Sequence, residues 1–220
     1  MLQASSLKFL KDLKKHNDKA WFDEHKQAYQ SAKEDFENLT QQLIQGIAKF
    51  DESVAHLQPK DCTFRIYKDV RFSKDKTPYK TNMGAYMSKG GKKSPFAGYY
   101  FQFEPGGKSF VAGGIWMPEA PILKKVRQEI DYNFADFSAI LSQKEFIKLF
   151  KTVEGEALKN APQGYNIDNP AIEYLKLKSF IVSKNIPDEL LTQPTLAREI
   201  IKLFAAMQPF NDFLNTALAE

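Results

Sequence analysis

The sequence predicts an α+β fold, in which one antiparallel, meander-like sheet of about four or five strands is packed by helices from both ends of the chain. Before residue 50 and again after Pro118, apolar residues recur at three- and four-residue steps, which is the spacing of amphipathic helices. Between Cys62 and Trp116 the apolar period changes to two, as in strands. Sequential strands with short connections pair antiparallel, because a parallel pair needs a long crossover.

Two helices are expected before residue 50. Ser5 or Ser6 can cap a short first helix, and Asn17 or Asp18 can cap a long second one that continues to about residue 50. The first helix carries Leu7, Leu10 and Leu13 on one face. The stripe of the second consists of Trp21, Phe22, Ala28, Tyr29, Ala32, Phe36, Leu39, Leu43, Ile47 and Phe50. A stripe of this length must pack on a large apolar surface.

Four strands are expected in the middle of the chain, at residues 63–68, 83–88, 98–104 and 108–116. The last two are joined through Pro105-Gly106-Gly107 as a tight hairpin. Residues 178–184 can add a further strand.

Helical spacing returns after Pro118 and predicts two or three short helices up to residue 150. Residues 155–170, which are rich in Gly, Asn and Pro, are the main irregular segment. A final helix is expected from about Thr195, and Pro209 should kink or split it, because proline removes a backbone donor and clashes with the preceding turn.

Composition indicates one folded domain over residues 1–220, since 43% of the residues are hydrophobic and 26% are charged. No secretory signal or membrane span is apparent, which favours a cytoplasmic location and no membrane partner. With three isolated histidines and one cysteine, no metal site and no cofactor are expected. Cys62 is expected to be a buried residue rather than a nucleophile. Oligomeric state cannot be read from the sequence.

The segment from Phe64 to Asn82 is the best candidate for a binding site. Extended to Lys93, it contains nine basic residues and two acidic ones, a local charge of +7 in a chain whose net charge is +4. Arginine can grip a phosphate or carboxylate with two hydrogen bonds, and lysine adds point charge. The candidate ligand-binding residues are Arg65, Tyr67, Lys68, Asp69, Arg71, Lys74, Lys76, Tyr79, Lys80 and Trp116.

Alternation along the strands predicts two different sheet faces. If their rows share a side, one face has a glycine floor and aromatic walls and is edged by Arg65, with Tyr67, Gly84, Tyr86, Tyr100, Gln102, Glu104, Phe110, Ala112, Gly114 and Trp116. The other face would hold Phe64, Ile66, Met83, Met87, Tyr99, Phe101, Phe103, Val111 and Ile115 against the helices.

The loop from Asp69 to Lys80 is expected to be pinned down by Val70, Phe72 and Tyr79. Asp75 can close an Asx-type turn within this loop. The same acids leave a second interpretation open, in which Asp69 and Asp75 pair with the cations and the charged loop only braces the fold.

The stretch from Arg65 to Lys80, Arg-Ile-Tyr-Lys-Asp-Val-Arg-Phe-Ser-Lys-Asp-Lys-Thr-Pro-Tyr-Lys, resembles the signature of an uncharacterised bacterial family, domain of unknown function 2461 (DUF2461). The resemblance covers nearly the whole chain. It extends to Asn17, Trp21-Phe22, Lys26, Tyr29, Gly113-Gly114-Ile115-Trp116, Pro118, Leu123 and Arg127. Lys68 stands where arginine is common in the family. The resemblance implies an architecture and a candidate surface, but no reaction.

Three functions remain open from the sequence. The first is a pocket for a small anionic ligand, with Asp69 as the proton acceptor if there is chemistry. The second is single-stranded nucleic-acid binding, with bases stacked on the sheet aromatics. The third is an interaction or structural module. Whether the chain is an enzyme is not decided by any of these observations.

Overall fold

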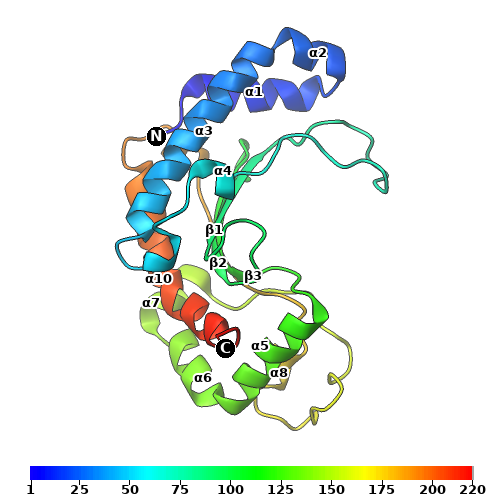
Figure 1. Ribbon diagram of the computed structural model, residues 1–220, viewed down its shortest axis with the longest axis vertical. Coiled ribbons are helices and arrows are strands. Elements are labelled where there is room, and N and C mark those ends of the chain that lie inside the picture. The colour runs from blue at the N-terminus through cyan, green and yellow to red at the C-terminus, as the bar shows by residue number, and fades with distance from the viewer. Residues whose placement is uncertain (220) are drawn as a thin grey trace.

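A four-stranded antiparallel sheet lies at the centre of the fold, as the sequence predicts (Figure 1). The computed structural model describes residues 1–219. The strands occur in the order β1 (Met83–Ser88), β2 (Gly98–Phe103), β3 (Phe110–Ile115) and β4 (Phe180–Asn185), and each pairs antiparallel with the next. The connection between β2 and β3 is the expected hairpin, in which Gly106 and Gly107 have φ of 95° and 71°. The chain therefore forms a meander whose last strand returns after a long helical excursion.

The N-terminal region forms three helices rather than two. These are α1 (Ala4–Lys15), α2 (Lys19–Glu24) and α3 (Lys26–Ile47). Asp18 caps α2 as expected, because its carboxylate accepts a hydrogen bond from the Trp21 amide at 2.9 Å. The prediction of one continuous helix from there to residue 50 is wrong, since the helix is interrupted at His25. The prediction of a serine cap for α1 is also wrong, because Ser6 lies inside the helix and donates to Asp35 instead.

The predicted strand at residues 63–68 is not present. A 3-10 helix, η1 (Glu52–Val54), is followed by a short helix, α4 (Pro59–Cys62), which contains the cysteine. Proline at the first helical position and the Asp61 carboxylate, which accepts from the Gln58 amide at 2.9 Å, start this helix. The following residues form only isolated bridges, at Thr63 and Tyr67.

Six helices follow the first three strands or flank the fourth. They are α5 (Ala120–Tyr132), α6 (Phe134–Leu141), α7 (Lys144–Phe150), α8 (Ile172–Leu175), α9 (Asp188–Leu191) and α10 (Leu196–Thr216). α10 continues through Pro209, so the expected split does not occur. Among residues 1–219, no helix is both long and apolar enough to cross a membrane.

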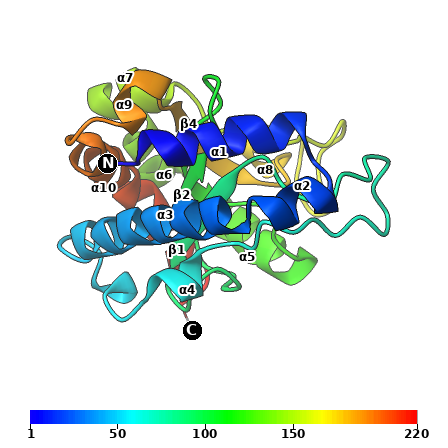
Figure 2. The ribbon, with the colours of Figure 1, turned by 90° about the horizontal axis from the view of Figure 1, so that it is seen from above.

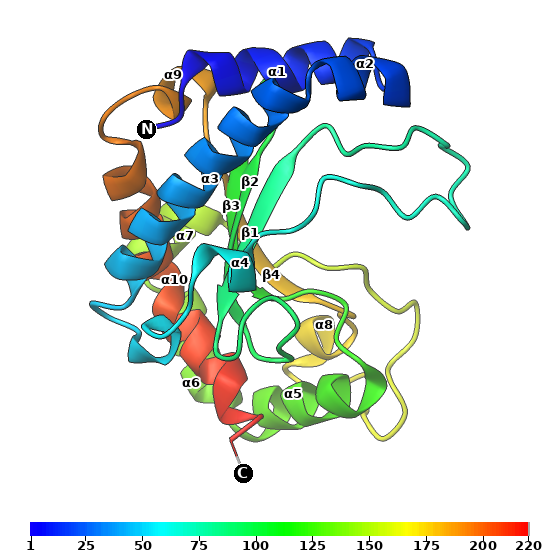
Figure 3. The same ribbon diagram turned by 45° about the horizontal axis from the view of Figure 1, so that its top comes forward.

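The two faces of the sheet differ in the way that alternation predicts. One face packs against α3 and α10, and we call it the helix face; Figure 3 shows the sheet edge-on, with these helices on one side. Above the sheet, α1 and α3 lie side by side (Figure 2). The buried residues of the helix face include Met83, Met87, Tyr99, Phe101, Phe103, Val111 and Ile115, all of which were predicted there.

The opposite side we call the open face. The strand register places Gly84, Tyr86, Gly98, Tyr100, Gln102, Phe110, Ala112, Gly114 and Ser183 on this side. The rows of β1, β2 and β3 therefore share one side, as the glycine-floored surface requires. Tyr67, which was also predicted on this face, instead packs against Phe22 and Tyr79.

Irregular chain segments lie along both outer edges of the sheet. Beside β1, the Phe64 amide donates to the Gly84 carbonyl at 2.9 Å. Beside β4, Glu154 and Ile181 exchange two backbone hydrogen bonds of 2.6 and 3.1 Å. Both edge strands thus have a partner outside the sheet.

Candidate ligand-binding site

The basic aromatic segment forms an arm, which we define as residues 64–82, between α4 and β1. The arm projects from the body of the molecule (Figure 1). Its two sides are joined near the base, where the Lys80 amide donates to the Ile66 carbonyl at 2.7 Å and the Lys68 amide donates to the Pro78 carbonyl at 2.9 Å. The base of the arm is therefore a short irregular hairpin rather than a strand followed by a free loop.

Asn17 fastens one side of the arm to the turn between α1 and α2. Its Nδ2 donates to the Tyr79 carbonyl at 2.9 Å, and its Oδ1 accepts from the Tyr79 amide at 3.1 Å. The Tyr79 ring, which is only 3% exposed, stacks on Phe22 with centroids 3.9 Å apart. The Tyr67 ring packs against both of these rings, at 5.9 Å from Phe22 and 5.4 Å from Tyr79. Both tyrosines therefore hold the arm in place, and Tyr79 is not available to a ligand in this conformation.

The Lys68 ammonium is bound by other residues of the arm. Its Nζ donates to Asp75 at 2.7 Å and to the Thr77 hydroxyl at 2.6 Å. Asp75 also accepts from the Thr77 amide at 2.9 Å, which confirms the predicted Asx-type turn. The hydrogen bond from Lys68, followed by those from Thr77, lowers the pKa of Asp75, so this carboxylate stays ionised under ordinary conditions.

Arg71 and Lys76 are also engaged by the arm itself. The Arg71 guanidinium makes two hydrogen bonds to Asp69, of 2.9 and 2.6 Å, and these bonds lower the pKa of Asp69. The Lys76 ammonium donates to the Val70 carbonyl at 2.9 Å. For these residues the bracing interpretation describes the geometry well.

Arg65, Lys74 and Lys80 differ from the other cations of the arm in their side-chain contacts. Within the described part of the chain, none of these three side chains has a hydrogen bond or an ion pair. Lys80 is partly buried, and its ammonium lies 5.7 Å from the centroid of the Phe64 ring. Burial, with a smaller contribution from the nearby charge of Arg65, lowers the pKa of Lys80 below the ordinary lysine value. Arg65 and Lys80 thus form a pair of cations at the base of the arm that makes no ion pair within 4 Å among residues 1–219, although the charge of Arg65 contributes to the lowered pKa of Asp69.

Phe72 does not anchor the loop, contrary to the prediction. Its side chain is 96% exposed, and the Arg71 guanidinium carbon lies 5.8 Å from its ring. The sequence alone does not predict this exposure, because an aromatic residue in a loop can either pack against the fold or project from it.

Trp116 is not near the arm. It follows the end of β3 that lies farthest from Phe110, and six residues of extended chain span about 20 Å. Its side chain is 73% exposed. The structure therefore brings the candidate residues of 65–80 together on one element and leaves Trp116 at the other end of the sheet.

The open face beside the arm carries a connected polar row. The Tyr100 hydroxyl donates to Gln102 at 3.0 Å, and the Gln102 amide donates to the Glu104 carboxylate at 2.9 Å. Burial, followed by the charge of Glu104, raises the pKa of Tyr100 to about 12, so the phenol remains a donor. Lys108 lies 3.9 Å from Glu104.

Phe64 lies on the open face, although the strand pattern predicted it on the helix face. It was expected under the helices, but it is 41% exposed and its ring lies 6.4 Å from that of Tyr100 on the open face. The error arises because Cys62 ends a helix, so alternation counted from Cys62 does not apply. Pro59 and Asp61 were the signals that could have identified this helix start.

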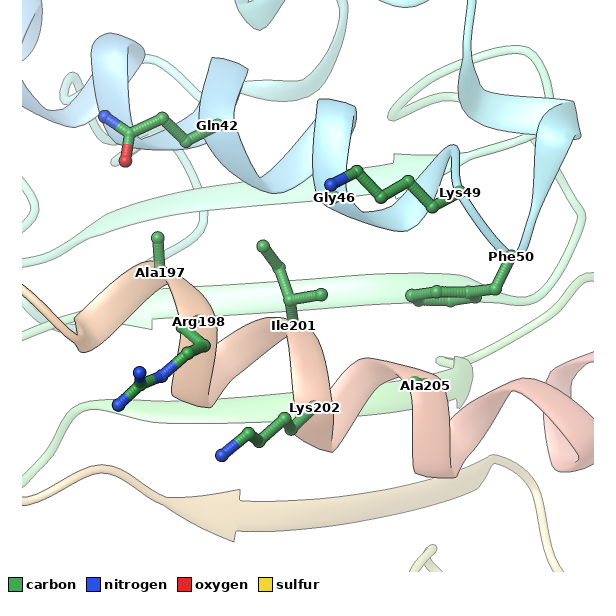
Figure 4. A pocket seen from close by; sticks show the side chains of 9 residues that line it. All are labelled: Gln42, Gly46, Lys49, Phe50, Ala197, Arg198, Ile201, Lys202 and Ala205. Carbon is green, nitrogen blue, oxygen red and sulfur yellow. The ribbon is translucent and has the colours of Figure 1, made fainter.

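A separate shallow groove lies between α3 and α10 (Figure 4). Gly46, Phe50 and Ile201 contribute apolar surface to it, and Lys49, Arg198 and Lys202 contribute cations. Arg198 and Lys202 both pair with Glu199 at 3.2 Å. None of the residues predicted to bind a ligand lines this groove.

The structure also bears on metal binding and on the reactivity of Cys62. Over residues 1–219, no three His, Cys, Asp or Glu side chains are grouped so that they could hold a metal ion. Cys62 is fully buried, and burial, followed by the charge of Asp61, raises the pKa of its thiol to about 12. A thiol with this pKa is a poor nucleophile near neutral pH.

Comparison with known families identifies the relatives of the chain. A model of conserved hypothetical proteins, DUF2461, matches residues 5–213. The chain belongs to the DUF2461 family. This match covers the arm, the sheet and most of α10. Searches of curated proteins and of solved structures gave no match. The family assignment therefore supports the resemblance seen in the sequence and supplies no activity.

Proposed function

We propose that this DUF2461 protein binds a small phosphate- or carboxylate-bearing ligand at the base of the arm, with Arg65 and Lys80 as its anion contacts. The observation that carries the proposal is the contrast among the cations of one short segment. Lys68 and Arg71 each have a carboxylate at 2.7 Å or less, whereas Arg65 and Lys80 have none among residues 1–219. A partly desolvated ammonium without a counter-charge is stabilised by an incoming anion.

The position of these two cations also supports the proposal. Lys80 lies on the side of the arm that Asn17 and Tyr79 hold in place, so its backbone is fixed before a ligand arrives. A site that is already ordered spends less binding free energy on immobilising its own side chains. Next to Lys80, Phe64 extends the site onto the open face.

The remaining cations of the segment have secondary roles in this proposal. Arg71 and Lys68 keep the shape of the arm, and Lys74 and Lys76 add long-range positive charge. Asp69 is a poor general base, because its hydrogen bonds from Arg71 lower its pKa. The proposal is therefore one of binding, and it assigns no reaction.

A nucleic acid is the second candidate ligand, and one observation favours it. The arm has six basic and two acidic residues, a charge of +4 that equals the net charge of the whole chain. At the tip, the exposed Phe72 ring is free to stack on an unpaired base. Binding of a single-stranded oligonucleotide that weakens steeply with added salt, and that Phe72→Ala reduces, would support this candidate.

The test of the anion site uses small probes and a matched pair of variants. Isothermal titration of the intact chain with inorganic phosphate, sulfate and citrate should show binding of at least one of them. The double variant Arg65→Gln, Lys80→Met should lose that binding, since methionine keeps the packing of the lysine stem and removes the charge.

Arg71→Gln is the control, because Arg71 is already held by Asp69. It should keep most of the affinity. Equal affinity in the double variant and the unchanged chain, or the absence of binding for every anion tested, would overturn the proposal.

A further inference from the structure

The open face next to the cation pair carries a row of aromatic rings. The Tyr100 ring leans over β1 and covers Gly84. A Cβ atom at residue 84 would lie 2.6 Å from the Tyr100 hydroxyl oxygen and 3.1 Å from Cε2. Only glycine leaves room for this position of the ring. The tyrosine therefore lies across the sheet instead of standing up from it.

Two further rings flank Tyr100. The Phe64 ring, from the arm, lies 6.4 Å away at 58°, and the Phe110 ring, from β3, lies 5.6 Å away at 49°. Tyr100 and Phe110 are partly buried, and Phe64 is 41% exposed. The three rings thus form a row, with Tyr100 as the floor and a tilted ring on each side. We call this row the aromatic trough.

Cations adjoin the aromatic trough beside Phe64, and a polar row adjoins it beside Tyr100. At the Phe64 end, the Lys80 ammonium lies 5.7 Å from the ring centroid, and Arg65 is close enough to lower the pKa of Lys80. Along the Tyr100 side, the hydrogen-bonded row leads through Gln102 to the Glu104 carboxylate. A ligand on this row of rings can therefore meet cations beside Phe64 and hydrogen-bond acceptors beside Tyr100.

We infer that the ligand of this site is a nucleoside phosphate, a class in which one molecule combines all three features. The base stacks on Tyr100 between Phe64 and Phe110, the phosphate binds Arg65 and Lys80, and an amino group of the base donates to Gln102 or Glu104. This inference rests on the proposed anion site and adds the identity of the group attached to the anion.

Other anions match the trough less well. A sugar phosphate satisfies the cations and leaves the three rings exposed. A nucleoside without phosphate leaves the cation pair unpaired.

The experiment compares AMP, ribose 5-phosphate and adenosine by isothermal titration. Base stacking on an aromatic side chain is worth about 1–3 kcal/mol, which corresponds to at least about fivefold in affinity. AMP should therefore bind at least about fivefold more tightly than ribose 5-phosphate. Tyr100→Leu should remove this preference and leave the affinity for ribose 5-phosphate nearly unchanged.

Two further variants make the test independent of the stability of Tyr100→Leu. Phe64→Leu alters a ring on the surface of the arm and should reduce the preference for AMP in the same direction. Trp116→Leu is the control, because this exposed ring lies at the far end of β3, and it should have no effect on either ligand.

The possible failures can be told apart. If ribose 5-phosphate and AMP bind equally well and both need Arg65 and Lys80, the nucleoside inference is wrong and the anion site stands. If AMP binds and the Arg65→Gln, Lys80→Met variant binds it equally well, the anion site is wrong, and so is the inference that depends on it. If none of the three ligands binds, the nucleoside inference is wrong, and the titrations with phosphate, sulfate and citrate decide whether the anion site stands.

Discussion

The helix face and the open face of the sheet are built by alternate residues of the same strands, yet they perform different tasks. On the helix face, Tyr99, Phe101 and Phe103 are fully buried and pack with α3 and α10. On the open face, Tyr100 and Gln102 are only partly buried and are joined by hydrogen bonds. Burying apolar area stabilises the fold, whereas a partly exposed polar and aromatic surface contributes less to stability and is free to bind.

The largest difference between the faces should appear in the free energy of unfolding. Phe101→Ala removes a ring that is 0% exposed and stacks 5.9 Å from Phe36, and we expect a loss of about 3–5 kcal/mol. Phe110→Ala on the open face should cost less than about 2 kcal/mol, because its cavity opens to solvent. Urea denaturation measures both. Similar losses for the two variants would contradict the division of tasks.

A smaller effect is expected where the arm is fastened beside the open face. Asn17→Ala leaves the amide and the carbonyl of Tyr79 without their side-chain partner, and we expect a loss of about 1–3 kcal/mol. The amide proton of Tyr79 should also exchange faster with solvent. Asn38→Ala, at an exposed position of α3, is the matched control and should stay within about 0.5 kcal/mol of the unchanged chain.

A pH titration tests whether the Lys80 ammonium, at the base of the arm, is the anion contact. The pKa of Lys80 lies below the ordinary lysine value of 10.5, so its ammonium loses its proton at a lower pH than a solvated lysine. If Lys80 binds the anion, affinity for sulfate should fall as the pH rises through that pKa, by up to about tenfold per pH unit above it. Lys80→Met should abolish this dependence. Constant affinity up to pH 10.5 in the unchanged chain would exclude Lys80 as the contact.

The smallest effect is expected at the outer part of the arm. Arg71→Ala breaks a pair with Asp69 whose side chains are 76% and 46% exposed. Exposed ion pairs contribute little to stability, so the midpoint of urea denaturation should barely move. A loss comparable to that of Asn17→Ala would mean that the outer arm supports the fold more than its exposure suggests.

Most of the architecture could be predicted from periodicity, because burial on one side imposes a period on the sequence. Met83 and Met87 on β1 and Phe101 and Phe103 on β2 were assigned to the correct face for this reason. The hairpin at Gly106 and Gly107 followed from local turn chemistry, since both residues need positive φ.

The errors occurred where local signals competed or where the decisive contact was distant in sequence. Contacts between distant residues could not be predicted even where the local structure was, as at Asp188, whose carboxylate accepts from the Gly106 and Gly107 amides at 2.7 and 3.0 Å across more than eighty residues. Asn17 is similar, since its pairing with Tyr79 has no signature in either segment. For the site, the sequence identified the correct segment but could not distinguish cations held by Asp69 and Asp75 from cations that remain unpaired.

The short backbone contacts along the sheet margins have a consequence for the life of the protein in a crowded cell. A bare edge strand exposes unpaired amides and carbonyls that another chain can join, which leads to aggregation. Here Phe64 occupies the margin of β1 and Glu154 occupies that of β4. The first residue of the arm, Phe64, thus covers the edge of β1 with its main chain and contributes its ring to the aromatic trough. A deletion that removed Phe64 would expose the unpaired backbone of β1 and would also remove a ring of the aromatic trough. Resistance to aggregation and ligand binding therefore depend on the same residue.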